Sequence, residues 1–298
     1  MPAPIALFAY KRADHLRQAV ESLLTNAECS QSHLFLFSDA PKKKEDVPAV
    51  EEVRKYLSAI KGFASVTIIK RNENLGLANS IISGVSMILE SNDRVIVLED
   101  DLVLSPYFLR YVNQALDLYA DDEQVASVHG YVYPVSTVLP GTFFLKGTDC
   151  WGWGTWKRAW KHFEPDATKL ISRLVDSRLA YSFDMDGSAN NMRMLTNQSK
   201  GLIDSWAIRW HAATYLRDMY TLYPGVSLVN NIGADGGGTH TDKTQAFNAV
   251  ISTAPVDVKR IPIEESSEAR NAFISYFKKT KPGILERMLR LVKKTIRK

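Results

Sequence analysis

Short apolar runs alternate with helical patterns through the first 130 residues, and this alternation constrains the fold more than any other feature. Between the runs, apolar residues recur at helical spacing, as in residues 77–89. Such alternation favours parallel strands joined by right-handed crossovers through helices. We therefore predict an α/β fold with a doubly wound, mostly parallel sheet, in which strands are expected at 5–9, 34–37, 66–69, 94–98 and 125–128.

The strand expected at 94–98 runs directly into three consecutive carboxylates at 99–101. Adjacent carboxylates repel one another and are costly beside a buried strand unless cations lie among them. Their hard oxygen donors suit Mg²⁺ or Mn²⁺. We expect Ser105 to cap a helix at 106–119, which puts the acidic residues at the carboxyl end of a strand, where open α/β sheets bind ligands. The alternative is a solvated acidic loop.

Polar side chains also follow the first two expected strands. Tyr10, Lys11 and Arg12 come after the first strand, and Asp39 comes after the second. The carboxyl ends of parallel strands meet at one edge of a sheet, so these side chains should converge with residues 99–101. Arg12 can pair with a diphosphate, and Asp39 can accept a hydrogen bond from a base or ribose. Each of them, taken alone, is more often a solvated loop residue.

Composition narrows the class of protein. Of 298 residues, 45% are hydrophobic and 23% are charged, as in ordinary soluble globular proteins. Cys29 and Cys150 lack the spacing of a zinc site, so we expect a reducing compartment. The first strand begins almost at the N-terminus and no run reaches membrane-spanning length, so we expect neither a signal peptide nor a spanning helix.

The charge is unevenly distributed. Residues 278–298 hold nine Lys or Arg against one Glu, which leaves a mildly acidic body that is a poor candidate for nucleic-acid binding. Within this tail, 283–298 reads as an amphipathic basic helix, a pattern typical of segments that lie in a membrane interface. We predict that it docks on an anionic membrane surface. A helix packed on the body is the alternative.

The second half of the chain is less regular. Four of the six tryptophans fall within 151–160, interleaved with glycines. We predict core burial for Trp156 and Trp160, whereas Trp151 and Trp153 are open to either burial or stacking on a sugar ring. Segment 166–200 is polar and weakly patterned.

Two later features have alternative interpretations. Asp204 precedes a helical pattern and can be either a helix cap or a functional carboxylate. The glycine-rich segment 230–240 can be either a lid over a substrate or a disordered connector.

Taken in order, these motifs resemble glycosyltransferases of the GT-A fold. They are most similar to the inverting N-acetylglucosaminyltransferase that begins complex N-glycan branching and to its bacterial relatives. The resemblance spans residues 4–240 and implies a nucleotide-sugar-binding half at 1–130, an acceptor-side half with a smaller mixed sheet at 131–245, and a C-terminal extension at 246–298. It rests on residues 5–24, Phe37-Ser-Asp39, the helix at 77–89, Glu-Asp-Asp with its flanks at 97–108, Gly152-Trp-Gly154, Asp204-Ser-Trp206 and Gly238-Thr-His240.

The resemblance also implies roles for individual residues. Asp101 would ligate Mn²⁺ or Mg²⁺ that bridges the donor diphosphate, with His240 as a candidate second ligand. Asp204 matches the family's general base, although Ser205 replaces a second aspartate, and Trp153 replaces a smaller apolar residue. Asp39 would read the uracil, and Glu99 and Asp100 would hold the sugar and ribose. The donor-binding residues implied are Tyr10, Arg12, Asp39, Ser80, Glu99, Asp100, Trp153 and Thr239.

The implied function is metal-dependent, inverting transfer of a sugar, such as N-acetylglucosamine, from a UDP-sugar to a hydroxyl of a glycan or lipid-linked acceptor. The family's membrane anchor and stem are missing, so we expect a cytoplasmic enzyme of bacterial surface-polysaccharide assembly, peripheral on the inner face of the membrane. A sugar nucleotidyltransferase is one alternative, but residues 8–13 lack the glycine-rich phosphate loop it needs. A catalytically inactive sugar-binding protein is another, against which stand Asp101 and Asp204 together.

Overall fold

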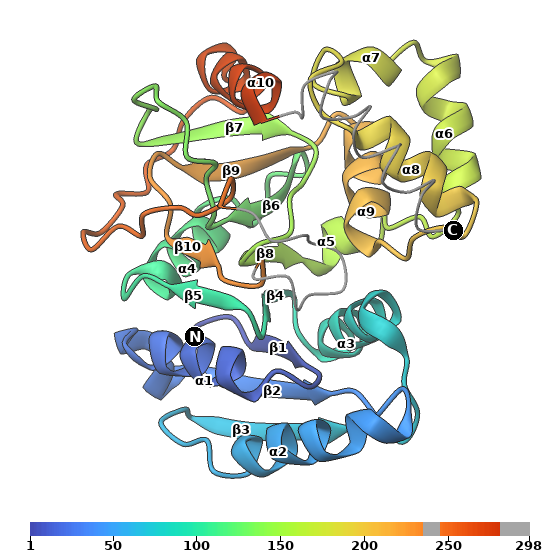
Figure 1. Ribbon diagram of the computed structural model, residues 1–298. Helices are drawn as coiled ribbons and strands as arrows, with labels where there is room; N and C mark the ends of the chain where they lie inside the picture. The colour runs from blue at the N-terminus through green and yellow to red at the C-terminus, as the bar shows by residue number, and fades with distance from the viewer. Residues whose placement is uncertain (235–244, 281–298) are drawn as a thin grey trace.

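The computed structural model describes residues 1–234 and 245–280 (Figure 1). An eight-stranded sheet forms the centre of the molecule, in the order β3-β2-β1-β4-β8-β6-β9-β7. β8 and β7 run antiparallel to their neighbours, and the other six strands share one direction. The predicted α/β fold with a mostly parallel, doubly wound sheet is therefore confirmed. The strands after residue 130, apart from β10, extend this same sheet, and a second sheet pairs β10 with β5.

The elements agree closely with the expected pattern in the first half of the chain. The strands are β1 (Ile5–Ala9), β2 (His33–Ser38), β3 (Ser65–Lys70), β4 (Arg94–Glu99), β5 (Leu102–Leu104), β6 (Val125–His129), β7 (Thr142–Lys146), β8 (Trp153–Trp156), β9 (Tyr220–Pro224) and β10 (Val229–Asn231). The helices are α1 (Ala13–Leu24), α2 (Val47–Leu57), α3 (Gly76–Ser91), α4 (Phe108–Leu118), α5 (Lys157–Trp160), α6 (Ala167–Asp176), α7 (Ala180–Phe183), α8 (Asn191–Ser199), α9 (Trp206–Tyr215) and α10 (Ser267–Thr280), with short 3-10 turns at Ala27–Gln31 and Lys44–Asp46.

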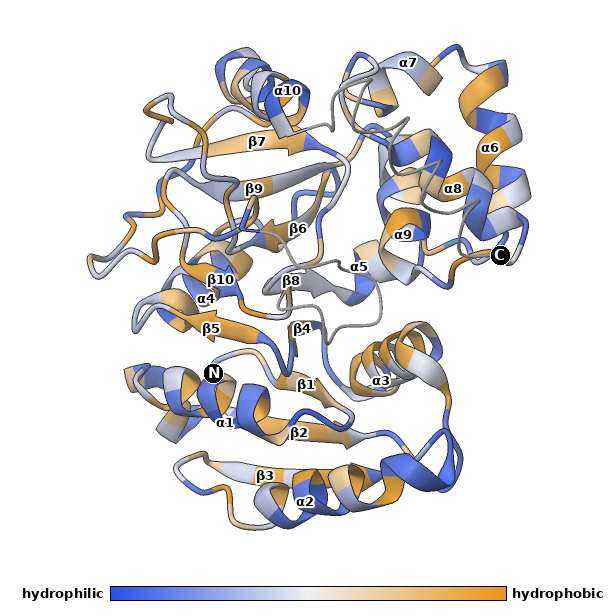
Figure 2. Cartoon of the chain, in the orientation of Figure 1, coloured by the Kyte–Doolittle hydropathy of each residue, from blue (hydrophilic) through white to orange (hydrophobic). Residues whose placement is uncertain are grey.

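Helices cover both faces of the sheet because the buried strands are apolar on both sides. In β1, Ile5 and Leu7 pack with residues of α1, α2 and α4. Ala6 and Phe8 point to the opposite face and pack with α3 and α9. Figure 2 shows apolar residues running along β1 and β2. Burial on both faces is the reason that these strands read as continuous apolar runs.

A helical cluster formed by α6, α7 and α8 packs beside α9, in the segment for which the sequence predicted little (Figure 1). The Asp166 side chain caps α6 by accepting hydrogen bonds from the backbone N–H groups of Thr168 and Lys169. Leu170 and Leu195 then pack against Ile208 on α9. The cluster therefore supports the helix that directly follows Asp204.

The prediction for the segment after the acidic residues was wrong in its details. Residues 102–104 form β5, which pairs antiparallel with β10, and α4 begins only at Phe108. Ser105 is not the cap of that helix. Its hydroxyl oxygen accepts from the Tyr107 backbone N–H at 3.2 Å, in the turn before the helix, and its hydroxyl donates to the Ser252 carbonyl oxygen, over 147 residues of sequence separation. The pairing of residues 102–104 with 229–231 is non-local, so local periodicity could not reveal it.

Three predictions lie outside the described residues: the roles of Thr239 and His240, and the basic helix at 283–298. In the described part of the C-terminal extension, α10 packs beside β7, where Phe273 contacts Phe143 and Tyr223.

None of the helices within 1–234 and 245–280 combines the length and the apolarity that crossing a membrane requires. Both cysteines are free.

Candidate active site

The strand register brings several of the predicted donor-binding residues to one edge of the sheet. Ala9 pairs with Ser38, and Phe8 pairs with Glu99. The residues that follow these pairs are Tyr10, Asp39 and Asp100, which therefore leave neighbouring strands at the same level. Their convergence is a direct consequence of parallel pairing, and it places polar groups where α/β sheets bind ligands.

Arg12 joins the acidic residues at this edge. Its Nη2 atom lies 2.9 Å from Asp100 Oδ1 and 2.6 Å from Asp101 Oδ2. The Tyr10 backbone N–H donates to Asp100 Oδ2 at 3.3 Å. Arg12 Nη1 and Asp101 Oδ1 are buried without a hydrogen-bond partner among the residues described. One guanidinium thus holds two carboxylates while leaving polar atoms for a further ligand.

Burial and mutual repulsion govern the acidic residues. Burial raises the pKa of Asp100 to about 6, although the Arg12 guanidinium opposes that rise. Burial also raises the pKa of Glu99 well above its ordinary value, and the carboxylates of Asp101 and Asp100 add to the effect. Three carboxylates at one strand end with a single neighbouring guanidinium favour the binding of a further cation.

Asp39 ties together the loops at this edge. Its Oδ1 atom accepts from the Ala40 and Leu75 backbone N–H groups, both at 2.9 Å, and its Oδ2 atom accepts from Gly76 at 3.0 Å. The Asp39 residue is 6% exposed. It therefore fixes the start of α3, and any contact with a nucleotide base would use the remaining lone pairs. Ser80 lies one turn further along, on the buried side of α3.

The structure separates Asp204 from the helix cap. Ser205 is the N-cap residue of α9, and its side chain accepts from the Ile208 backbone N–H at 3.4 Å. Asp204 Oδ1 instead accepts from Arg209 Nη2 at 3.3 Å, and the Asp204 side chain is 54% exposed. Asp204 Oδ2 faces Gly76 at the start of α3. The capping alternative for Asp204 is therefore wrong, and the carboxylate remains available at the surface.

Tryptophans fix the helix that follows Asp204. Trp153 has no exposed surface, and its ring stacks on Trp206 with centroids 5.2 Å apart. Trp160 packs against both Trp153 and Trp210. In this structure Trp153 is a core residue that supports the start of α9, and it does not present a face for sugar stacking. The predicted burial of Trp156 and Trp160 is confirmed.

Contact between the acidic residues and the segment after β10, residues 232–233, was not predicted from the sequence. After β10, the Ile232 backbone N–H donates to the Asp101 carbonyl oxygen at 2.9 Å, and Gly233 N–H donates to Asn231 Oδ1 at 2.7 Å. A Cβ atom at Gly233 would lie 2.1 Å from Asp101 Oδ2. The backbone thus closes over the acidic edge at a position where only glycine fits. The sequence signal was present in the glycine-rich run that begins at this residue.

The oxygen atoms at the acidic edge fit a divalent cation held by one protein carboxylate. Within the described ranges, no group of three or more His, Cys, Asp or Glu side chains is arranged to hold a metal ion. Asp101 nevertheless offers a buried oxygen, Oδ1, that has no hydrogen-bond partner in the described part of the chain. Mg²⁺ and Mn²⁺ sites of enzymes that act on phosphates commonly use one or two carboxylates and complete the shell with phosphate and water oxygens.

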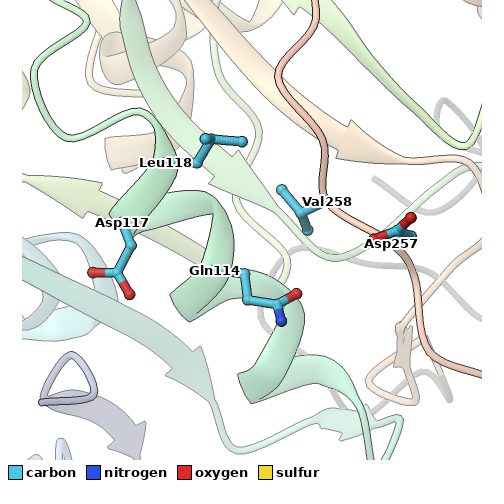
Figure 3. Close-up of a pocket in the computed structure, with 5 residues that line it drawn as sticks. All are labelled: Gln114, Asp117, Leu118, Asp257 and Val258. Atoms are coloured by element: carbon cyan, nitrogen blue, oxygen red, sulfur yellow. The ribbon is translucent and has the colours of Figure 1, made fainter.

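A separate pocket does not belong to this site. It lies between α4 and residues 257–258 and is lined by Gln114, Asp117, Leu118, Asp257 and Val258 (Figure 3). None of the predicted site residues lines it, and Asp117 forms an ion pair with Arg94. The acidic edge of the sheet is therefore the candidate active site.

The chain is an α/β protein with a doubly wound sheet, and its acidic edge lies at the carboxyl ends of strands, where such sheets bind nucleotides. Residues 5–164, more than half of the chain, match the family described as Glycosyl transferase family 2, and the chain belongs to that family. No curated protein matches it.

Solved structures show distant similarity. One is the mannosyltransferase PcManGT from Pyrobaculum calidifontis in complex with GDP-Man and Mn²⁺, with 14% identity over 45% of this chain and 38% of that one, and a TM-score of 0.32. Another is S. aureus TarS 1–349 in complex with UDP-GlcNAc, with 12% identity over 48% of this chain and 39% of that one, and a TM-score of 0.35. A further TarS structure has 10% identity over 50% of this chain and 25% of that one, and a TM-score of 0.33. The chain thus spans well under half the length of these proteins.

Proposed function

We propose that this family 2 glycosyltransferase moves a sugar from a UDP-sugar to an acceptor hydroxyl, with inversion and with the help of a divalent cation. The observation that carries the proposal is the pairing of Arg12 with Asp100 and Asp101 at the carboxyl edge of the sheet. A diphosphate and its cation need both a guanidinium and a free carboxylate oxygen, and this edge offers both. The resemblance of Phe37-Ser-Asp39 to the corresponding motif of GT-A glycosyltransferases supports uracil recognition by Asp39.

In this proposal Arg12 and Asp101 act on the donor, and Asp204 acts on the acceptor. Arg12 would bind the donor diphosphate, while Asp101 would hold the cation through Oδ1. When bound, that cation would offset the negative charge that develops on the leaving diphosphate. Asp204, exposed and held by Arg209 through one oxygen only, would take the proton from the acceptor hydroxyl. General-base catalysis of this kind contributes about 10² to 10⁴ in rate.

Several finer attributes belong to the same proposal. N-acetylglucosamine as the transferred sugar and a glycan or lipid-linked acceptor both follow from the resemblance. Work at the inner face of a bacterial membrane, in surface-polysaccharide assembly, would bring the enzyme to a lipid-linked acceptor. The basic segment 283–298 would hold it there through anionic lipids, where each Lys or Arg contributes about 1 kcal/mol.

The test is release of UDP from a panel of UDP-sugars, with Mn²⁺, with Mg²⁺ and with a chelator, and with GDP-mannose as the matched non-uridine donor. We expect one or a few UDP-sugars to react only when metal is present. Asp101→Asn should abolish metal-dependent donor binding. Binding without turnover on every donor would favour the inactive sugar-binding alternative. Formation of a nucleotide-sugar from a nucleoside triphosphate would favour the nucleotidyltransferase.

A further inference from the structure

The loop between β7 and β8 carries a carboxylate and a tryptophan that have no part in the donor chemistry above. We propose that Asp149 and Trp151 bind an uncharged pyranose ring of the acceptor. Asp149 would accept hydrogen bonds from ring hydroxyls, and Trp151 would contact the ring's C–H face. This inference rests on the proposed glycosyltransferase function and names the acceptor side of the same site.

The strand register places this loop beside the acidic residues. β8 runs antiparallel to β4, and its first residue, Trp153, pairs with Val97. Residues just before Trp153 therefore lie next to the end of β4, where Glu99 stands. Burial raises the pKa of the Cys150 thiol, and the carboxylates of Asp149, Glu99 and Asp101 raise it further. Cys150 is thus close to both Asp149 and the donor-side carboxylates.

Two buried imidazoles hold the loop in a fixed shape. The Trp151 backbone N–H donates to His129 Nε2 at 2.9 Å. His211 Nδ1 lies 2.7 Å from the Thr148 carbonyl oxygen and 3.0 Å from the Thr148 backbone nitrogen. Binding residues that are already ordered lose little entropy when a ligand arrives. Asp149 and Trp151 are therefore preorganised.

Asp149 retains capacity to accept hydrogen bonds. Its partners among the described residues are uncharged: the Cys150 backbone N–H at 2.9 Å, the Tyr133 hydroxyl at 3.4 Å and the Cys150 thiol. An ionised carboxylate has about four acceptor positions, so acceptor capacity remains for a ligand. The negative charge of the Asp149 carboxylate, which has no cationic partner among these contacts, disfavours a phosphate and favours an uncharged ligand with hydroxyl donors.

Partly exposed aromatic side chains surround the carboxylate. Trp151 packs against Tyr131 and Phe247 with ring centroids 4.7 and 5.6 Å apart, and remains partly exposed. Tyr133 is also partly exposed. Apolar, mostly aromatic walls with a few well-placed polar groups are typical of small-molecule sites. A pyranose offers both an apolar C–H face and a hydroxyl edge, so it matches this combination.

The experiment compares wild type with Asp149→Asn, Trp151→Ala and Trp151→Phe, and uses the exposed Asp121→Asn as the matched control. A panel of p-nitrophenyl pyranosides is first tested with wild type, and the one that wild type glycosylates serves as the acceptor. Three quantities are measured for each protein: kcat/KM for the acceptor, the Kd for UDP with Mn²⁺, and donor hydrolysis without acceptor. We expect Asp149→Asn to lower acceptor kcat/KM by roughly 10- to 100-fold, as for loss of a hydrogen bond to a charged group.

UDP affinity and acceptor-free hydrolysis should stay within about twofold of wild type, because neither uses the acceptor side. Trp151→Phe should retain most of the acceptor affinity that Trp151→Ala loses. Unchanged acceptor kcat/KM in Asp149→Asn, or an equal loss of UDP binding, would overturn the proposal. Absence of transfer by wild type itself would count instead against the proposed function.

Discussion

Arg12 Nη2 lies 2.6 Å from Asp101 Oδ2, so the protein's own guanidinium sits on the carboxylate proposed to hold the divalent cation. In the absence of ligand this pairing partly neutralises a buried acidic edge. It also means that a cation arriving alone would meet a neighbouring positive charge. A donor diphosphate changes the balance because it gives Arg12 another anionic partner. Metal and donor should therefore bind cooperatively.

Arg12→Ala should affect the two ligands in opposite directions. Binding of Mn²⁺ alone should tighten by roughly tenfold, since two like charges about 4 Å apart repel by up to about 4 kcal/mol at an effective dielectric constant of 20. UDP binding in the presence of Mn²⁺ should weaken by roughly tenfold or more, because a charge-assisted hydrogen bond is lost. Electron paramagnetic resonance of free Mn²⁺ and calorimetry with UDP measure the two affinities. Arg17→Ala, on the exposed side of α1, is the control. Equal Mn²⁺ affinity in Arg12→Ala and wild type would contradict the cooperativity.

Asp204→Asn and Ser205→Ala should separate catalysis from capping. Asp204→Asn should keep UDP affinity while transfer falls by about two to four orders of magnitude, as expected for loss of a general base. Ser205→Ala removes the cap of α9 and should lower the free energy of unfolding by about 0.5 to 2 kcal/mol with little effect on transfer. Single-turnover assays and urea unfolding distinguish the two. Wild-type-like transfer by Asp204→Asn would require a different base.

Gly233→Ala should damage the acidic edge through sterics alone. A methyl group there would lie 2.1 Å from Asp101 Oδ2 and 3.1 Å from Arg12 Nη1, so the carboxylate or the backbone has to move. Displacements of about 1 Å at an active site can cost about 10²-fold in rate, and we expect a loss of that order in kcat/KM with weaker Mn²⁺-dependent UDP binding. Gly141→Ala is the matched control, because nothing lies within 4 Å of its added Cβ. Similar kinetics for the two variants would show that the contact at Gly233 is unimportant.

The convergence of polar residues at the acidic edge could be predicted from the sequence because buried parallel strands give a local pattern, a short apolar run. The strands β1, β2 and β4 end at Ala9, Ser38 and Glu99, and the polar residues that follow converge by register. Non-local pairing was not predictable in the same way. β5 forms only because residues 229–231 arrive beside it, and the closure of Gly233 over Asp101 depends on that pairing.

Adjacent polar residues limited the prediction at Asp204. Asp and Ser are both good caps, so sequence alone could not tell that Ser205 caps α9 and that Asp204 points towards α3. The sequence also left open whether Trp153 is buried or stacks on a sugar ring. Glycines on both sides of it suggested an open loop, whereas the segment is the buried strand β8, stacked against Trp206. Tertiary packing decided both cases.

The imidazoles that hold the β7–β8 loop should make stability depend on pH. Burial lowers the pKa of His129 and of His211, while Asp149 opposes the shift in both. His129 Nδ1 lies 2.9 Å from the Tyr131 carbonyl oxygen, and its Nε2 accepts from Trp151 N–H, so the native contacts require the neutral ring. Unfolding releases both rings to protonate near their ordinary pKa of about 6.5. The stability that these two histidines contribute is therefore fully present above that pH and falls as the pH decreases, by up to about 1.4 kcal/mol per pH unit for each proton taken up.

The contribution of the two histidines to the free energy of unfolding should decrease between about pH 7 and pH 5, and the raised pKa values of Asp100 and Glu99 act in the opposite sense. The readout is therefore the difference between wild type and His129→Gln, which should lack the contribution of one of the two protonations. Glutamine keeps both a donor and an acceptor, so the loop contacts have a substitute. Urea unfolding at several pH values measures the slope directly. His33→Gln, at an exposed histidine on β2, should leave it unchanged. If the free energy of unfolding depends on pH in the same way in His129→Gln and wild type, protonation of His129 does not contribute to the pH dependence.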